Sequence, residues 1–505
     1  MERTIIAEAA SEPATSPQHE TDVYAIHGAD PEVLAYAMAK YSRSSLTLKE
    51  SLREISAQRA EQFLNTFYFQ YGHRSIADLA HIPFAIERLS LLAAISLVDE
   101  QRWDGQERST RYQDFRKSGW FTPQLGVETD PYNAAIKALF AAYDQVGKGM
   151  LEALKSAIAR PETMKPEAYE RTLKARAFDV ARYLLPLATN TSLGQIVNAR
   201  TLETQVSRLL TSEFAEIRSL GGKLRLAASE PAWNPQPEGA RDVKAAPTLV
   251  KYAVANDYQR ETRTLLSQAA AELMCGQPID SAPVVDLVEA DESLEVELAT
   301  SLLYPHCHFS YRQLRANVSA LDAPRIAELI ALGTRHRGRH DELLRAFHAG
   351  AALRFDILMD IGGFRDMHRH RRCTQLLQSF TDLHGYETPD APGQPTLAAA
   401  GLEATYNSAM QAALAAYRAL KGSGVEEASQ SAQYCLPLAT RCRSLFKMDF
   451  AEALYIAELR SGVAGHYSYR RVAWEMYEAV RRQHPSLAGM FRIDDVREPV
   501  DLLRR

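Results

Sequence analysis

The pentapeptide LPLAT occurs twice in this 505-residue chain, at residues 185–189 and again at 436–440. Self-similarity between distant positions is the usual sign of a duplicated architecture. A second pair of segments supports it: AKYSRSSLTLKESLREI at 39–55 and SLLYPHCHFSYRQLRANV at 301–318 both carry a tyrosine, then small or polar residues, then a helical pattern. The repeat therefore predicts two similar domains in tandem.

A segment of linker composition separates the two copies. Residues 228–247, ASEPAWNPQPEGARDVKAAP, are rich in proline, alanine and charge and show no apolar periodicity. The first residues of the chain lack the basic start and apolar core of a signal peptide, so we expect a mobile extension there. The expected organisation is an extension at 1–24, a first domain at 25–230, a linker at 231–246 and a second domain at 247–505.

Both copies are expected to be rich in helices. Apolar residues recur at three- and four-residue spacing through 181–220, and the helical pattern at 405–424 ends on a glycine C-cap signal. LSLLAAISLV at 89–98 is far shorter than the ~20 residues that span a bilayer and predicts a buried helix. Strand candidates are few, namely AHIPFAIER at 80–88 and the segment entering MHRHRR at 367–372. We predict a helix-rich α+β fold.

The composition excludes several classes of protein. Hydrophobic residues make up 46% and charged residues 24% of the chain, as in soluble globular proteins. The net charge of −5 argues against a chain-wide surface for nucleic acid or membrane, and we expect neither partner. The five cysteines are scattered and never spaced as CxxC, which disfavours a disulfide framework and fits a reducing cytoplasm.

One cluster has the chemistry of metal ligands: His306, Cys307 and His308. Its two histidines are only two positions apart and no further ligand set lies nearby. In the alignment of the two copies, the cluster falls opposite residues 43–45, which are arginine and two serines. We therefore expect no metal site.

A basic run stands out against the acidic background of the chain. Within MHRHRRCTQLLQSF at 367–380, five consecutive positions carry imidazole or guanidinium groups, which predicts a local anion site. If the run is extended, Arg369 and Arg371 point to one side and His370 to the other, so that one short motif contacts two ligands. The alternative is a solvated basic turn or a simple phosphate-contacting patch.

This run resembles the RHRx7S motif of flavin-dependent thymidylate synthases, because Arg369, His370 and Arg371 are followed by seven residues and then Ser379. That family methylates dUMP to dTMP with methylenetetrahydrofolate, reduced FAD and NADPH, and needs no cysteine nucleophile. The resemblance implies catalytic roles for Arg369, Arg371 and Ser379, FAD contacts for the three residues of the RHR triplet, and a nucleotide contact for Ser379.

The first half resembles other parts of the same family pattern. YGHRSIADLAHIPFAIERLS at 71–90 is similar to a helical segment with His-x-Ser, and QERSTRYQ at 106–113 to the Glu-x-Ser-x-Arg-Tyr nucleotide segment. The resemblance implies nucleotide contacts for Glu107, Ser109, Arg111 and Arg182. It implies FAD contacts for Ser75 and Asn198, and for Arg460 in the second half.

Each half also departs from the family pattern. In the first half, counting back from Ser109 places Asp99, Glu100 and Gln101 where the RHR motif belongs. In the second half, the Glu, Arg and Tyr of the nucleotide segment, the arginine before LPLAT and the asparagine are replaced by Leu377, Thr381, Asp382, Gln433 and Asp449. Neither half holds a complete set of residues, but the two sets are partly complementary.

Family members build their active sites between the subunits of a homotetramer. The resemblance therefore implies a homodimer of tandem chains that forms a pseudo-tetramer, with composite sites in which the first half supplies nucleotide contacts and the second supplies RHR. Two other functions stay open: a flavin- and nucleotide-binding paralogue with a different alkylation or reduction, and a nucleotide-binding protein without turnover. For Arg111 and Arg182, the alternative is pairing with local acids such as Asp114 or Glu203 in a surface network.

Overall fold

The computed structural model describes residues 28–40, 47–54, 74–235, 242–251, 253–289, 293–338, 341, 344–348 and 353–504. The extension expected at 1–24 lies outside these residues, as does the middle of the linker expected at 231–246. The domain boundaries stay a prediction. Within the described ranges, no helix is both long enough and apolar enough to cross a membrane.

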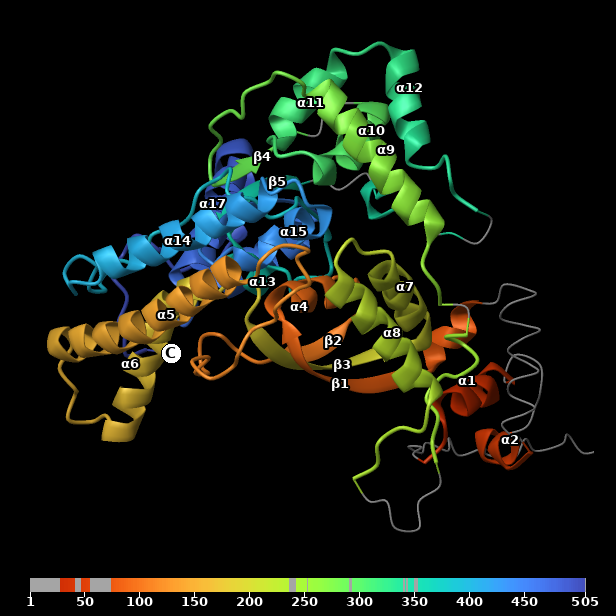
Figure 1. The fold of residues 1–505 in the computed structure, drawn as a ribbon, viewed down its shortest axis with the longest axis horizontal. Coiled ribbons are helices and arrows are strands. Elements are labelled where there is room, and N and C mark those ends of the chain that lie inside the picture. Colours follow the sequence, from red (N-terminus) through yellow and green to blue (C-terminus); the bar gives the residue numbers. More distant parts are fainter. Residues whose placement is uncertain are drawn as a thin grey trace, which may run out of the picture.

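The described elements fall into two successive sets (Figure 1). The first set is α1 (Pro31–Ala39), α2 (Leu48–Glu54), η3 (Arg74–Leu79), β1 (His81–Ser90), α4 (Leu91–Leu97), β2 (Asp104–Glu107), α5 (Asp130–Ala157), α6 (Pro166–Ala181), η4 (Arg182–Leu184), β3 (Asn190–Asn198), α7 (Ala199–Leu210) and α8 (Ala215–Ser229).

The second set is α9 (Asp257–Leu273), β4 (Val285–Leu287), α10 (Leu294–Leu303), η5 (Tyr304–His306), α11 (Tyr311–Ser319), α12 (Ala323–Leu332), η6 (Arg345–Phe347), β5 (Leu353–Asp360), α13 (Ile361–Met367), β6 (Thr374–Leu377), α14 (Glu403–Lys421), α15 (Glu426–Ser431), η7 (Ala432–Cys435), β7 (Arg441–Met448), α16 (Phe450–Ser461), α17 (Tyr467–Gln483) and η8 (Pro485–Met490).

Each half contains one antiparallel sheet with the same strand arrangement. The first sheet has the order β1-β3-β2 and the second β4-β5-β7-β6, so β3 and β7 occupy matching central positions. The strand β4 is an addition at the edge of the second sheet. Each central strand runs into a helix, α7 or α16, in the same way. This repetition confirms the helix-rich α+β fold with two tandem copies.

The two LPLAT segments pair with each other across the molecule. The amide of Leu187 donates to the carbonyl of Leu436 at 2.9 Å, and the amide of Leu438 donates to the carbonyl of Leu185 at the same distance. The pattern repeats one residue on, from Ala188 to Tyr434 and from Ala439 to Tyr183. Because each bond is returned by the equivalent residue of the other half, the halves are related by a local two-fold axis.

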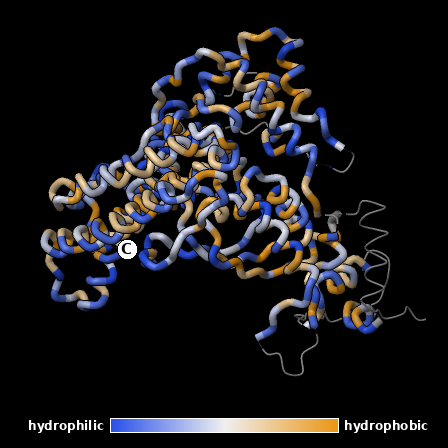
Figure 2. The backbone as a smooth tube through the Cα atoms, viewed as in Figure 1, coloured by the Kyte–Doolittle hydropathy of each residue, from blue (hydrophilic) through white to orange (hydrophobic). Residues whose placement is uncertain are grey.

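A shared hydrophobic core joins the two halves. The long helix α5 of the first half packs along α14 of the second, and both appear side by side in Figure 1. Leu139 and Tyr143 of α5 belong to the same buried cluster as Tyr406 and Met410 of α14. Figure 2 shows hydrophobic and hydrophilic residues alternating along these helices, as expected when only one face is buried.

Helix caps fix the path from strand to helix in each half. Ser90 Oγ accepts a hydrogen bond from the amide of Ala93 at 2.9 Å at the start of α4, and Asp360 Oδ1 accepts one from Gly363 at 2.7 Å at the start of α13. The helix expected within 89–98 is thus present as α4. The strand expected to enter MHRHRR ends earlier, at Asp360, because this cap turns the chain into α13 before the basic run begins.

Candidate functional site

The three residues of the RHR triplet point into different surroundings. Arg369 is exposed, and its guanidinium forms no hydrogen bond or ion pair with any residue that the structure describes. His370 is buried, and its Nε2 accepts a hydrogen bond from Arg460 Nε at 2.7 Å. Burial and the neighbouring arginines lower the pKa of His370 to about 3, so the ring is neutral at physiological pH.

The side chain of Arg371 contacts the first half of the chain. Its guanidinium lies 4.4 Å from the ring centroid of Trp103, within the range of a cation–π contact. Burial, together with the charge of Arg369, lowers the pKa of Arg371 to about 10, and the side chain stays protonated. Of the two RHR arginines, Arg369 is therefore the one presented to a ligand.

The nucleotide-like segment of the first half lies next to Arg369. Glu107 ends β2 and forms an ion pair with Arg365 of α13, while Ser109 and Arg111 follow in the next turn. Together these side chains line one pocket, which we call the junction pocket. Its wall consists of Glu107, Arg108, Ser109, Thr110 and Arg111 from the first half and Arg365, Asp366 and Arg369 from the second.

The junction pocket is small, with an open volume of about 20 Å³. Arg369 is the exposed arginine at its edge. The structure thus brings together four of the residues singled out in the sequence, from opposite halves of the chain: Glu107, Ser109, Arg111 and Arg369.

Arg111 is held from both halves. Its guanidinium donates to both carboxylate oxygens of Asp179, at 2.7 and 3.1 Å, to the Tyr469 hydroxyl at 2.8 Å and to the Ala464 carbonyl at 3.1 Å. Burial favours the neutral form, but the Asp179 carboxylate outweighs it and raises the pKa of Arg111 above its ordinary value. Most of the donors of Arg111 are already used, which fixes its orientation beside the pocket.

Arg182 reaches the junction pocket through Asp366. It is only 1% exposed, and its Nη1 lies 3.0 Å from Asp366 Oδ2. Its Nε and Nη2 atoms have no hydrogen-bond partner among the described residues. Burial opposes ionisation of Asp366, but Arg182 and Arg111 lower its pKa to about 2.

The alternative partners expected for these two arginines are wrong. Arg111 pairs with Asp179 and Arg182 with Asp366, in a buried network and not on the surface. Asp114, by contrast, holds the exposed Arg116. Long-range packing against α6 and α13 supplies the acids, and neighbours in the sequence do not.

The remaining sequence candidates lie away from the junction pocket. Ser379 is exposed and does not line it, although it belongs to the same motif as Arg369. Asn198 caps α7, where its Oδ1 accepts from the amide of Thr201 at 2.8 Å. Arg460 holds His370, as described above. Ser75 lies in η3, and its side chain is outside the described residues.

Sequence reasoning missed several side chains around the pocket. Arg365 and Asp366 precede Arg369 by four and three positions, so a helix leading into the basic run would have placed all three on one face. Asp179 and Tyr469 carried no local signal, because they reach Arg111 from distant helices.

The HCH cluster packs as part of the second half. His306 Nδ1 lies 3.1 Å from Ser267 Oγ, and burial raises the pKa of the Cys307 thiol to about 11. In the described part of the chain, no group of three or more His, Cys, Asp or Glu side chains is placed to hold a metal ion.

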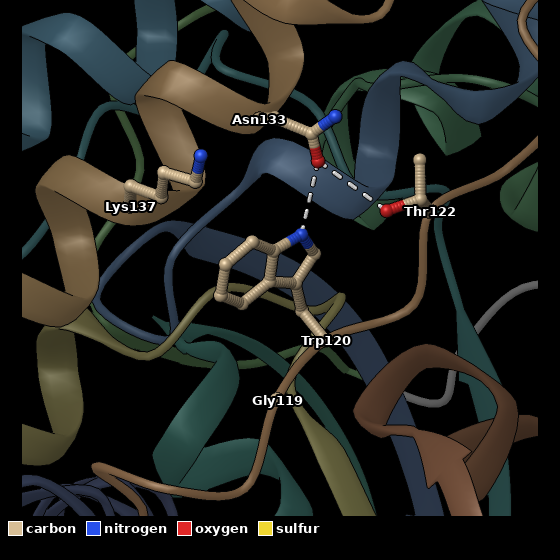
Figure 3. A pocket seen from close by; sticks show the side chains of 5 residues that line it. All are labelled: Gly119, Trp120, Thr122, Asn133 and Lys137. Carbon is tan, nitrogen blue, oxygen red and sulfur yellow. Dashed lines mark hydrogen bonds between the residues drawn. The ribbon is translucent and has the colours of Figure 1, made fainter.

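A larger surface pocket of about 430 Å³ is lined by Gly119, Trp120, Thr122, Asn133 and Lys137 (Figure 3). Asn133 Oδ1 accepts hydrogen bonds from Trp120 Nε1 at 3.1 Å and from Thr122 Oγ1 at 3.3 Å. None of the residues singled out in the sequence lines this pocket.

Comparison with known proteins identifies the family. The family model described as "Thymidylate synthase complementing protein" matches residues 25–228 and 306–486. The chain belongs to this family, and the two matched segments fall in its two halves.

Two relatives match this chain along nearly the whole length of both sequences. A UPF0159 protein of Chlamydia pneumoniae is 27% identical over 96% of this chain and 93% of its own length, and one of Thermoplasma acidophilum is 25% identical over 91% and 94%. A flavin-dependent thymidylate synthase of Clostridium tetani is 25% identical over 44% of this chain and 82% of its own. A solved structure of a flavin-dependent thymidylate synthase from Helicobacter pylori, complexed with FAD and dUMP, is 18% identical over 40% of this chain and 90% of its own, with a TM-score of 0.24.

Proposed function

We propose that the chain is a flavin-dependent thymidylate synthase-like enzyme that methylates dUMP, or a close pyrimidine nucleotide, at the junction pocket. The observation that carries this proposal is the meeting of Glu107, Ser109 and Arg111 from the first half with Arg369 from the second. FAD would be the cofactor, with methylenetetrahydrofolate and NADPH as cosubstrates and the cytoplasm as the compartment. Belonging to the family supports the proposal, but each half alone lacks part of the residue set.

The guanidinium groups around the pocket suit anionic ligands. Arg369 is exposed beside the pocket, whereas the Nε atoms of the buried Arg182 and the partly buried Arg365 are covered and have no partner among the described residues. Guanidinium forks bind phosphate and other oxyanions through paired hydrogen bonds. A nucleotide phosphate and the pyrophosphate of FAD are ligands of this kind. The exposed guanidinium of Arg369 therefore fits either group.

The residues of the pocket would bind and orient the nucleotide. Glu107 is paired with Arg365, Ser109 lines the pocket, and the contacts with Asp179 fix the orientation of Arg111 beside it. In the net reaction, the hydrogen on C5 of the pyrimidine is replaced by a methyl group whose carbon comes from methylenetetrahydrofolate. When bound, reduced FAD supplies the electron pair for this reduction, and NADPH restores it.

The small volume of the junction pocket favours completion of the site by a second chain. We therefore infer a homodimer that forms a pseudo-tetramer, with Ser75, Asn198, His370, Arg371 and Arg460 contributing directly or indirectly to the flavin site. Light scattering at micromolar concentration should give twice the mass of one chain. A monomer would reject this assembly.

Release of tritium from [5-³H]dUMP in the presence of FAD, NADPH and methylenetetrahydrofolate tests the activity. We expect release by the wild type, a large loss in Arg369→Ala, and little change in Arg116→Ala, an exposed arginine outside the pocket. Calorimetry with dUMP should show a greater loss of affinity for Ser109→Ala than for Ser379→Ala. The reverse order would place the nucleotide against the second half alone.

A second candidate function follows from the acids beside the pocket. Asp179 and Asp366 already neutralise Arg111 and Arg182, which leaves less positive charge for a phosphate than an open arginine cluster would. A yellow chain that binds a nucleotide without releasing tritium would favour a paralogue with a different flavin-dependent reaction. A colourless chain that binds a nucleotide would favour a binding protein without turnover.

A further inference from the structure

The local two-fold axis generates a second position equivalent to the junction pocket. Counting on from the capping residues Ser90 and Asp360, the ninth residue is Asp99 in the first half and Arg369 in the second. The second position therefore combines Asp99 with the counterparts of Glu107, Ser109 and Arg111, which are Leu377, Ser379 and Thr381. Glu107 and Arg111 thus correspond to uncharged residues, and Arg369 corresponds to an aspartate.

Asp99 is engaged by the other half of the chain. Its Oδ1 lies 2.5 Å from Arg345 Nη1, its carbonyl accepts from Arg345 Nη2 at 2.9 Å, and His368 Nε2 lies 3.7 Å from the carboxylate. Burial opposes ionisation of Asp99, but Arg345 and its other cationic neighbours lower its pKa. The Asp99 carboxylate is thus charged and paired with Arg345, whereas the side chain of the equivalent Arg369 is exposed.

Arg345 has an arginine counterpart in the first half. It begins η6 as Arg74 begins η3, and the strand registers agree, because Leu353 and Ile82 pair with the equivalent residues Met448 and Val197. At the second position, an arginine has thus become an aspartate, and this aspartate binds Arg345 of the other half.

The neighbouring residue shows the same kind of change. Glu100 stands at the position of His370, and its Oε1 accepts from Arg208 Nε at 3.0 Å and Nη2 at 2.8 Å. Two adjacent acids therefore bind two arginines in place of the RHR motif. The two arginines are thus neutralised by carboxylates and are not available to a nucleotide phosphate or a flavin.

We propose that each chain carries one nucleotide site, at the junction pocket, and that the second position has become a structural clasp between the halves through Asp99 and Arg345. The claim about the number of sites rests on the proposed function, whereas the clasp rests on the contacts alone. Two measurements separate these claims.

The first measurement is the stoichiometry of dUMP binding to the FAD-loaded chain by calorimetry. We expect one dUMP per chain, and the same number for Asp99→Asn and Arg345→Gln. Two dUMP per chain in the wild type would overturn the inference. If no dUMP binds, the proposed function fails, and the second measurement alone decides on the clasp.

The second measurement is a double-mutant cycle on Asp99→Asn and Arg345→Gln, followed by urea unfolding. We expect each single change to lower the folding equilibrium constant at least tenfold, and the pair to be coupled at least fivefold. The matched control is the exposed ion pair between Arg325 and Glu328, whose coupling should stay below about twofold. Coupling at Asp99 no larger than in this control would overturn the clasp.

Discussion

The two sheets share the order of three strands but differ in the side chains on one face. Ile196 and Lys447 are each the seventh residue of the central strand, and each lies opposite the first residue of its neighbour, β2 or β6. Ile196 is 51% exposed, whereas the side chain of Lys447 is 1% exposed. An apolar residue faces solvent in one copy, and a charged residue is buried in the other.

The difference lies in what covers the sheet. In the second half, Glu297 of α10 binds Lys447 Nζ at 2.6 Å and Arg354 Nη2 at 2.9 Å. A buried charge is tolerated only when it is paired, so the lysine depends on the covering helix. The two halves thus share their helix caps and strand pairing. Their side chains differ where different elements pack over the sheet.

The largest expected effect comes from removing the shared acid of the second sheet. Glu297→Ala should cost about 3–5 kcal/mol of unfolding free energy, because it leaves the charges of Lys447 and Arg354 buried without their carboxylate. The matched change in the first half, Ile196→Lys, should stay within about 0.5 kcal/mol, since the position is exposed. Urea unfolding followed by circular dichroism measures both. A loss below 1 kcal/mol in Glu297→Ala would contradict the comparison.

The helix caps should differ in their pH dependence. Burial raises the pKa of Asp360 to about 6, so its contribution to stability is full below pH ~4 and is lost as the pH rises to about 6. Asp360→Asn removes this titration and keeps a capping side chain. Its stability relative to the wild type should therefore rise by up to about 3 kcal/mol between pH 4 and 7.

Asp360→Ser, which copies the cap of the first half, should show the same trend with pH. Thermal unfolding across this range provides the measurement. A difference between wild type and variant that does not change with pH would show that Asp360 does not titrate there.

Asp366 should show the opposite pH dependence. Its pKa is lowered to about 2, so the stability it contributes is present above pH ~4 and is lost as the pH falls toward 2. Asp366→Asn should cost up to about 2.5 kcal/mol near neutral pH, and the cost should fade in acid. The equivalent residue of the first half is Ser96, where alanine should have little effect. Equal losses at pH 7 and pH 3 would reject the Arg182 pairing as the cause.

The smallest expected effect concerns ligand affinity at the two equivalent positions. Arg369→Ala removes one charge-assisted contact and should weaken dUMP or FAD at least tenfold, or about 1.5 kcal/mol. Asp99→Ala should leave both affinities unchanged, because the second position is the clasp. Fluorescence titration of FAD and calorimetry of dUMP give the two values. Loss of ligand in Asp99→Ala with retention in Arg369→Ala would exchange the roles of the two halves.

Features that depend on local sequence were predictable. Repetition of LPLAT indicated the duplication, apolar spacing indicated the helices, and the strand expected at 80–88 overlaps β1 (His81–Ser90). These signals come from propensity and periodicity, which act between neighbours in the chain. The strand expected just before the basic run was misplaced, because Asp360 caps a helix there and ends the strand seven residues before MHRHRR begins.

The composition of the candidate site was only partly predictable. A local motif places Arg369 and Ser379 together in the sequence, yet the two-fold arrangement sets Arg369 beside Ser109. Likewise Arg371 looks like a second anion-binding group until Trp103, from the other half, covers it. Such pairings arise from tertiary packing between distant segments, and no spacing rule within one segment contains them.

The hydrogen bonds at the axis carry no information about which half is which. The residues that form them are identical in the two halves, namely a tyrosine, two leucines and an alanine at matching positions. A half could therefore form the same bonds with a second copy of itself. The hydrogen bonds therefore do not decide which two halves pair. The covalent link between the halves does so, because it holds each first half next to a second half. A mutation in one half then always faces the same residues of the other half. Two equivalent positions can therefore take different roles, one in binding a ligand and the other in holding the halves together.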